Sequence, residues 1–216
     1  MKRSLFLFIY LLLSNTALAK TRSVIQVGGF SSGKLDNWNN KSFSGTTDYR
    51  LTLLDKLQVL KAESHSAASG LFKEQKIDLH KTPVLNWRWR IENHLNPLNE
   101  QDKQGDDYSA RIYVVVSGGW AFWKTKAINY VWASHTPKGH IWPNAFAGNN
   151  AMMIALRSTT DKTQTWYQEK RNIRQDLKAQ FGTDIRYIDA IALMTDTDNT
   201  KGSAIAYYGD IYFSEK

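Results

Sequence analysis

Cysteine is absent from this sequence. Its absence excludes disulfide bonds, thiol nucleophiles and thiolate metal sites, so histidine and carboxylate side chains remain as candidate metal ligands. The stability of the fold must therefore come from burial of apolar surface. Eight tryptophans, ten tyrosines and nine phenylalanines can supply that surface.

No apolar run in the sequence is long enough to span a bilayer comfortably. The longest, residues 5–13, follows Lys2 and Arg3 and precedes the small-residue stretch Ala17-Leu18-Ala19. This order is typical of a cleavable secretory signal peptide. We therefore expect residues 1–19 to be removed after Ala19. The mature protein is then periplasmic or secreted and has no transmembrane segment.

Linkers, low-complexity tracts and internal repeats are also missing, so residues 20–216 are predicted to form a single domain. Loss of Lys2 and Arg3 with the signal peptide lowers the formal net charge from +8 to +6. This modest excess favours anionic envelope polymers as partners. The basic residues are dispersed along the chain, which argues against nucleic acid as a partner.

Short segments of alternating or β-branched residues recur between turn signals and predict strands. They are residues 24–27, 49–54, 57–63, 84–91, 108–116, 127–133, 151–157, 163–170, 185–195 and 204–213. One helix is expected, capped by Asn172, with Gln175 three residues later and Gly182 at its end. The predicted fold class is all-β, a jelly-roll-like antiparallel β-sandwich with one short helix.

Two of these segments carry charge on one face. In residues 84–91 two arginines lie opposite the tryptophans, and in residues 108–116 an arginine and a tyrosine lie opposite apolar side chains. We expect neighbouring strands that share one charged surface, because arginine forks suit carboxylate, phosphate or sulfate groups. Its candidate ligand-binding residues are Arg88, Arg90, Asp107, Arg111, Tyr113 and Glu169. A network of salt bridges between adjacent strands is the structural alternative.

Exposed tryptophans could add stacking surfaces for sugar rings. Trp120, Trp123 and Trp142 lie in turn-like segments, and Trp142 joins the candidate ligand-binding residues. Residues 134–150 show no clear strand pattern and predict a long loop. The tryptophans expected in the core share a face with other apolar side chains and are Trp87, Trp89 and Trp132.

Hard oxygen ligands gather at Asp196, Asp198 and Asn199, which suits a calcium ion. A turn between residues 185–195 and 204–213 is the alternative, with Asp and Asn side chains capping backbone amides. No cofactor other than calcium is indicated. The five histidines include no His-Glu-x-x-His helix, which argues against zinc.

Catalytic signatures are few. The sequence has no nucleophile elbow, phosphate loop or dinucleotide fingerprint. A glycosidase that uses a pair of carboxylates, such as Asp107 with Glu169, stays an alternative, although spacing along the chain does not fix the separation of the two groups. A lyase is a further alternative, with Arg111, Tyr113 and His135 as its candidate residues.

Several motifs together resemble a known family. They are Ala68-Ser69-Gly70-Leu71, Leu85-Asn86-Trp87-Arg88-Trp89-Arg90, Gly105-Asp106-Asp107-Tyr108-Ser109-Ala110-Arg111, Asn129-Tyr130-Val131-Trp132-Ala133, Phe181-Gly182 and Thr195-Asp196-Thr197-Asp198-Asn199-Thr200. In this order they resemble the bacterial domain-of-unknown-function 3047 family. The resemblance implies an exported or envelope protein and brings no established catalytic residues.

A looser resemblance, carried by residues 69–79 and 207–213, is to galactose-binding-like jelly rolls found among carbohydrate-binding modules. We therefore expect an exported, non-catalytic module that binds a glycan or another envelope polymer through the charged face and loop aromatics. Two alternatives stay open. One is a polysaccharide-acting hydrolase or lyase with the same face as its cleft, and the other is a protein-binding envelope scaffold.

Overall fold

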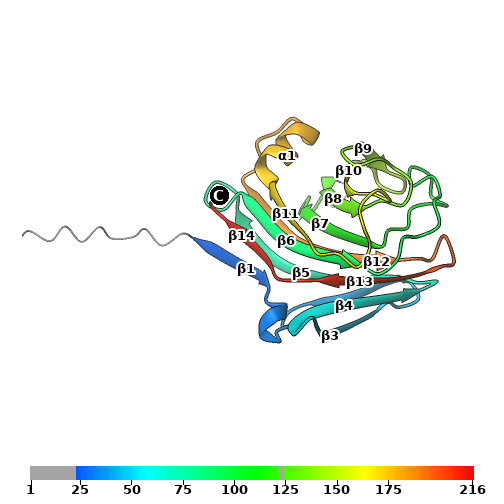
Figure 1. Cartoon of the computed structure of the whole chain (residues 1–216). Helices are drawn as coiled ribbons and strands as arrows, with labels where there is room; N and C mark the ends of the chain where they lie inside the picture. The colour runs from blue at the N-terminus through cyan, green and yellow to red at the C-terminus, as the bar shows by residue number, and fades with distance from the viewer. Residues whose placement is uncertain (1–22, 122–123) are drawn as a thin grey trace, which may run out of the picture.

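Alternation of apolar and polar side chains gives most strands one buried and one outward face, and two layers of such strands pack together (Figure 1). The computed structural model describes residues 23–121 and 124–216. The signal peptide predicted for residues 1–19 lies outside these ranges. No helix among the described residues is long and apolar enough to cross a membrane.

Seven strands form the first layer, sheet A. They are β1 (Val24–Gly28), β3 (Asp48–Leu54), β4 (Leu57–His65), β6 (Val84–Ile91), β11 (Tyr167–Asn172), β13 (Ser203–Tyr208) and β14 (Ile211–Ser214). The order is β1-β14-β6-β13-β4-β3, with β11 along the other edge of β6. All neighbouring pairs are antiparallel. A short 3-10 helix, η1 (Phe30–Ser32), follows β1.

The second layer, sheet B, also has seven strands. In spatial order they are β2 (Asn39–Ser44), β5 (Ala68–Asp78), β12 (Tyr187–Asp196), β7 (Ala110–Val116), β8 (Lys126–Trp132), β10 (Gly148–Arg157) and β9 (Ile141–Asn144). Only β8 and β10 pair in parallel among these described strands. The expected antiparallel sandwich is confirmed, with this pair as its one departure.

Aromatic side chains from the two sheets meet in the core. Trp87 and Trp89 of β6 point inward and lie edge to face, with ring centroids 5.5 Å apart. Trp87 packs on Tyr130 of β8 at 5.4 Å, and Trp89 packs on Trp132 at 6.0 Å. All four side chains are buried. The prediction that these three tryptophans belong to the core is confirmed.

The single helix, α1 (Ile173–Phe181), lies beside β11 and packs on β6 and β11 (Figure 1). Asn172 caps its start by accepting a hydrogen bond from the Gln175 amide at 3.1 Å. Gly182 ends it with a positive φ of 70°, which glycine adopts without steric cost. Leu177 is fully buried and anchors the helix in the core. The expected helix is confirmed at both ends.

Several strands depart from the sequence-based expectation. The polar edge strand β2 shows no apolar alternation, and β5 entered the expectation only through the jelly-roll likeness. The expected loop at 134–150 contains β9 and the start of β10. The expected strand 204–213 is divided into β13 and β14 at Gly209.

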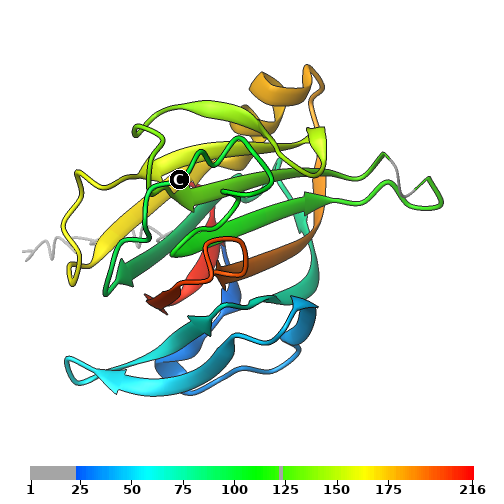
Figure 2. The ribbon, with the colours of Figure 1, turned by 90° about the vertical axis from the view of Figure 1, so that its right-hand side faces the viewer.

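The outward face of sheet B is only partly open. Over β8 and β10, long connections cover a small second core, which consists of Tyr108, Val131, Ala133, Trp142, Met153 and Ala155. The buried carboxylate of Glu100 joins these connections by accepting hydrogen bonds from the amides of His135 and Thr136 at 3.2 and 2.8 Å. The hairpin of β7 and β8 extends beyond the rest of the sheet (Figure 2).

Candidate functional site

The two charged segments do not share a surface. β6 belongs to sheet A and β7 to sheet B, and their apolar faces meet in the core. Arg88 and Arg90 therefore point to the opposite side of the sandwich from Arg111 and Tyr113. The expectation of neighbouring strands was wrong, because the chain between residues 92 and 109 crosses to the other sheet instead of turning back as a hairpin. A period of two identifies the faces of a strand but not its partners.

On sheet A the charged side chains have partners. Arg90 donates to Glu92 at 2.8 Å and to Asp55 at 3.3 Å. The Arg88 guanidinium lies 4.8 Å from the centre of the Trp166 ring. The contacts of Arg90 are ion pairs of the kind that the structural alternative expects, whereas the contact of Arg88 is a cation–π interaction.

Glu169 joins the two sheets at one edge of the sandwich. It accepts hydrogen bonds from Arg157 of β10 at 2.6 Å and from the Trp89 indole at 3.1 Å. Asp107 precedes β7 of sheet B and has different partners, the backbone amides of Asn199 and Thr200.

A groove runs along the open outward face of sheet B. It consists of two adjoining cavities of about 740 and 490 Å³, which share Phe43, Tyr113 and Met194. Small residues line it where larger side chains would fill the space: Gly70, Ala127, Ala151, Ala190 and Ala192. Register places Ala192, Tyr113 and Asn129 side by side on adjacent strands.

The two cavities differ in charge. The larger one carries Lys41 and Lys76 against Glu74 and Asp189, and we refer to it as the neutral half of the groove. The smaller one, the acidic half, is lined by Arg111 against several aspartates. Those aspartates are Asp106, Asp196 and Asp198.

Phe43 forms one rim of the groove and is 65% exposed. It lies in the edge strand β2 where the pairing with β5 shifts register between Ser42 and Ser44. A β-bulge at such a position redirects a side chain. A large apolar ring is thereby held at the mouth of the groove.

Phe146 forms the rim at the other edge of sheet B and is 62% exposed. The side-chain oxygen of Asn144 accepts hydrogen bonds from the amides of Phe146 and Ala147, both at 3.0 Å, and so fixes the turn after β9. The amide nitrogen of Asn144 donates to both carboxylate oxygens of Asp106, at 3.2 and 3.3 Å. This second rim is thus attached to the floor of the acidic half.

Arg111 is the charged centre of the acidic half, although its side chain is only 4% exposed. It makes a two-pronged ion pair with Asp196, including an Nε–Oδ1 hydrogen bond of 3.0 Å, and lies 3.7 Å from Asp106. Burial raises the pKa of Asp196 and of Asp106, and Arg111 opposes both shifts. The pair is held in a fixed geometry with little access for water.

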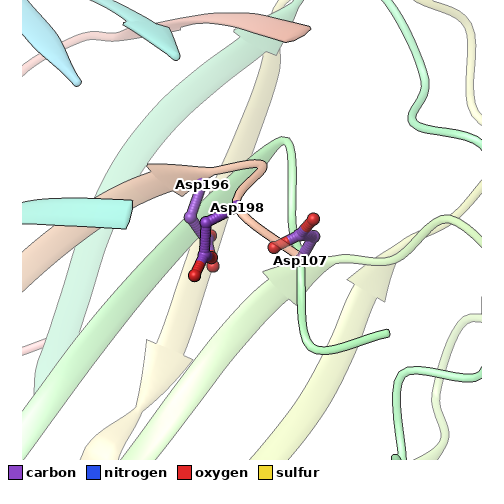
Figure 3. Close-up of side chains that lie close together, drawn as sticks. All are labelled: Asp107, Asp196 and Asp198. Atoms are coloured by element: carbon purple, nitrogen blue, oxygen red, sulfur yellow. The ribbon is translucent and has the colours of Figure 1, made fainter. Parts of the chain in front are cut away.

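Three carboxylates lie close together near the end of β12. Asp196, Asp198 and Asp107 bring oxygens within 4.8 Å of one another, with Asp107 facing the end of β12 (Figure 3). The Asp107 carboxylate accepts hydrogen bonds from the amides of Asn199 and Thr200 at 3.2 and 2.6 Å. These hydrogen bonds to the turn after β12 account for the position of Asp107. Calcium binding by Asp196, Asp198 and Asn199 stays a prediction.

Asn129 is the unusual residue of the floor. It is 1% exposed, lines the acidic half, and its Oδ1 atom has no hydrogen-bond partner. Buried side-chain polar groups in folded proteins almost always have such a partner. An acceptor without a partner, in a residue that lines a cavity, is a candidate contact for a ligand.

The tryptophans that were expected to be exposed differ in their exposure in the structure. Trp142 is 3% exposed and belongs to the small second core, so the expectation that it is exposed was wrong. Trp120 is fully exposed in the β7–β8 connection, as expected. Trp123 lies outside the described residues.

Sequence reasoning missed the two rim phenylalanines and Asn129. Phe43 and Phe146 were detectable as single aromatic residues within stretches of polar and small residues, a context that favours exposure. Asn129 had no comparable signal, because its lack of a partner depends on the tertiary packing around it.

Comparison with solved structures gives the class of this fold. It is similar to the family 30 carbohydrate-binding module of the cellulosomal cellulase Cel9D-Cel44B of Clostridium thermocellum, with a TM-score of 0.52, 8% identity, and coverage of 90% of this chain and 98% of the other. The family 11 module of Lic26A-Cel5E from the same organism matches with a TM-score of 0.46, 10% identity, and coverage of 90% and 95%. A cellulase derived from Cel12A of Rhodothermus marinus matches with a TM-score of 0.46, 10% identity, and coverage of 88% and 100%. The likeness to carbohydrate-binding jelly rolls is confirmed for the fold.

Residues 36–212 match the family described as protein of unknown function (DUF3047), and the chain belongs to that family. This confirms the resemblance seen in the sequence motifs. No curated protein sequence is significantly similar to the chain.

Proposed function

We propose that this protein binds a glycan chain in the sheet B groove and leaves it chemically unchanged. The observation that carries the proposal is the pair of exposed rim residues, Phe43 and Phe146, at the mouth of a groove that also contains Tyr113. Sugar rings have apolar C–H faces and hydroxyl edges. Such a ligand fits aromatic side chains above a floor of fixed polar groups.

The polar floor supports the same proposal. Asp106, Asp198 and Asn129 offer acceptors for hydroxyl donors, and the ion pair of Arg111 with Asp196 keeps that floor rigid. Fixed groups lose little conformational entropy when a ligand binds. The fold shared with a carbohydrate-binding module adds support, although a fold does not by itself determine function.

Glycoside hydrolysis is the second candidate, and a specific feature favours it. Burial raises the pKa of both Asp106 and Asp198, which line the acidic half of the groove. A carboxyl group with a raised pKa is what a general acid in glycoside hydrolysis requires. The alternative predicts shortened products, whereas the binding proposal predicts an unchanged ligand.

A glycan array probed with the mature protein, in calcium and in chelator, tests the proposal. We expect selective binding to a small set of glycans and no shortening of those glycans after prolonged incubation. Binding that disappears in chelator would support calcium at Asp196 and Asp198. A blank array in both buffers would contradict glycan binding, and released fragments would favour the hydrolase.

Export is part of the proposal, because a binding module for an envelope glycan must reach that compartment. The motif at residues 1–19 supports it. Fractionation of producing cells followed by intact-mass analysis should find a periplasmic or secreted chain that begins at Lys20. A full-length chain retained in the cytoplasm would contradict export.

A further inference from the structure

The acidic half of the groove has more negative than positive charge, in a protein whose formal net charge is +8. Among the described residues, three aspartates and one arginine line it, and the Asp107 carboxylate has an oxygen within 4.8 Å of oxygens of Asp196 and Asp198. Lys103 lies at the rim, with its ammonium 5.4 Å from the centre of the Phe146 ring. The neutral half has two lysines and two acids. The net charge of the groove therefore changes along its length, from neutral in one half to negative in the other.

Arg111 compensates only part of the negative charge that lines the cavity, since one guanidinium pairs with Asp196 and lies 3.7 Å from an oxygen of Asp106. Its guanidinium donates to both oxygens of Asp196 and, at 3.4 Å, to the backbone oxygen of Asp106. The Asp106 carboxylate receives hydrogen bonds from Asn144, a neutral side chain. No ion pair joins Asp198 to a basic residue in the described part of the chain.

Asn129 supplies an independent indication of a ligand in the same cavity. Its buried Oδ1 atom has no partner within the protein, and it can only accept hydrogen bonds. The surplus carboxylates are also acceptors only when they are ionised. The floor of the acidic half thus complements a ligand group rich in donors.

We propose that the acidic half of the groove receives the protonated amino group of an amino sugar within the bound glycan. This inference rests on the proposed glycan binding and narrows the class of ligand. An ammonium group has three donors and a positive charge, so it complements Asp106 and Asp198 in charge and in hydrogen bonding. A uronic acid or a phosphate would bring like charge to this end of the groove. Anionic envelope polymers, expected from the net charge, are therefore disfavoured.

A metal ion would also be attracted to these carboxylates. We favour the amino group because both oxygens of Asp196 accept N–H donors from Arg111, and both oxygens of Asp107 accept backbone amides. Ca²⁺ binding is an outcome that the experiment distinguishes.

The test uses three hexasaccharides with the same β-1,4 backbone that differ only at the second carbon of each sugar. Cellohexaose has a hydroxyl there, chitohexaose an N-acetyl group, and its fully deacetylated form an ammonium. Calorimetric titration of the mature protein in EDTA, at a pH that keeps the amine charged, should show the deacetylated hexamer binding at least about tenfold more tightly than the other two.

Matched variants locate the preference. In Asp198→Asn the preference should fall to about twofold or less, because a carboxylate facing the cavity is lost. Asp55→Asn, on sheet A and outside the groove, should keep it. Thermal unfolding of each variant provides the folding control. If Asp198→Asn unfolds, Asp106→Asn takes its place with the same expectation.

Three results would overturn the inference. The hexamers could bind equally, the neutral hexamers could bind more tightly, or Asp198→Asn could keep the full preference. A neutral hexamer that is preferred only in calcium would instead assign the acidic half to a metal ion. Array binding without an amine preference removes this inference and leaves the proposed function intact, whereas a blank array and no hexamer binding remove both.

Discussion

The charged and polar side chains on the two outward faces of the sandwich differ in whether they have partners within the protein. On sheet A, basic side chains and acids within a strand or on neighbouring strands pair with one another, as Arg90 does with Glu92 and Arg50 and Lys61 do with Glu63. On sheet B, small residues open a groove in which Asn129 has no hydrogen-bond partner and the carboxylates outnumber the one arginine.

This comparison shows that charge density alone does not identify a site. Exposed ion pairs satisfy each other at little gain or cost in stability, so a charged sheet face can be purely structural. A cavity with polar groups that the protein leaves unsatisfied costs stability and is a better sign of a ligand. The strongest charge pattern in the sequence, at Arg88 and Arg90, lies on the face without the larger cavities.

The largest expected difference between the faces is in stability. Arg111→Met removes the buried partner of Asp196 and should lower the free energy of unfolding by about 3–5 kcal/mol, because buried carboxylates are left without compensation. Arg90→Met on sheet A should cost about 1 kcal/mol or less. Urea denaturation measures both. Equal losses would remove the distinction between the two faces.

The second expected difference is in ligand affinity. Replacing both rim residues, Phe43→Ala with Phe146→Ala, should weaken glycan binding by about 30-fold, the effect of losing about 2 kcal/mol from an aromatic anchor. Stability should change little because both rings are exposed. Arg88→Ala on sheet A should leave affinity unchanged. Calorimetric titration measures the affinity of each variant. A loss of affinity in Arg88→Ala, but not in the double rim variant, would place the binding site on sheet A.

Asn129 should show opposite effects on stability and binding. Asn129→Leu removes a buried polar group that has no partner, so the free energy of unfolding should rise by about 1 kcal/mol. Glycan affinity should fall by about tenfold because an acceptor in the floor is lost. Denaturation and titration of the same preparation measure both effects. A variant that is less stable and binds normally would make Asn129 a structural residue.

The smallest expected effect concerns a paired acid on sheet A. Hydrogen bonds from Lys61 and Arg50 lower the pKa of Glu63 to about 2. A folded-state pKa below the unfolded value of about 4.3 stabilises the protein above that pH, and the contribution disappears as the pH falls through about 2. Glu63→Gln should therefore lower stability by less than about 1 kcal/mol at neutral pH and have no effect in strong acid. An effect independent of pH would contradict this origin.

Local patterns in the sequence predicted the elements well. Alternation placed β6 at its observed bounds and put Trp87, Trp89 and Trp132 in the core. The capping pattern placed both ends of α1. These features depend on residues close together in the chain, where side-chain periodicity and capping chemistry act directly.

The site was less predictable because it depends on contacts between distant segments. Which sheet receives β7 is decided by a long connection that has no pattern of its own. Phe43 reaches the groove through a bulge in a polar edge strand, and Trp142 is buried by the loops that Glu100 joins. None of these features has a short-range signal in the sequence.

Mapping backbone amide resonances during titration with the strongest glycan from the array tests the central claim most directly. Binding in the sheet B groove predicts that the largest shifts occur at Tyr113, Asn129 and Ala192, which line it. Shifts concentrated instead at Arg88, Gln168 and Tyr212, around the small hollow on sheet A, would contradict the account.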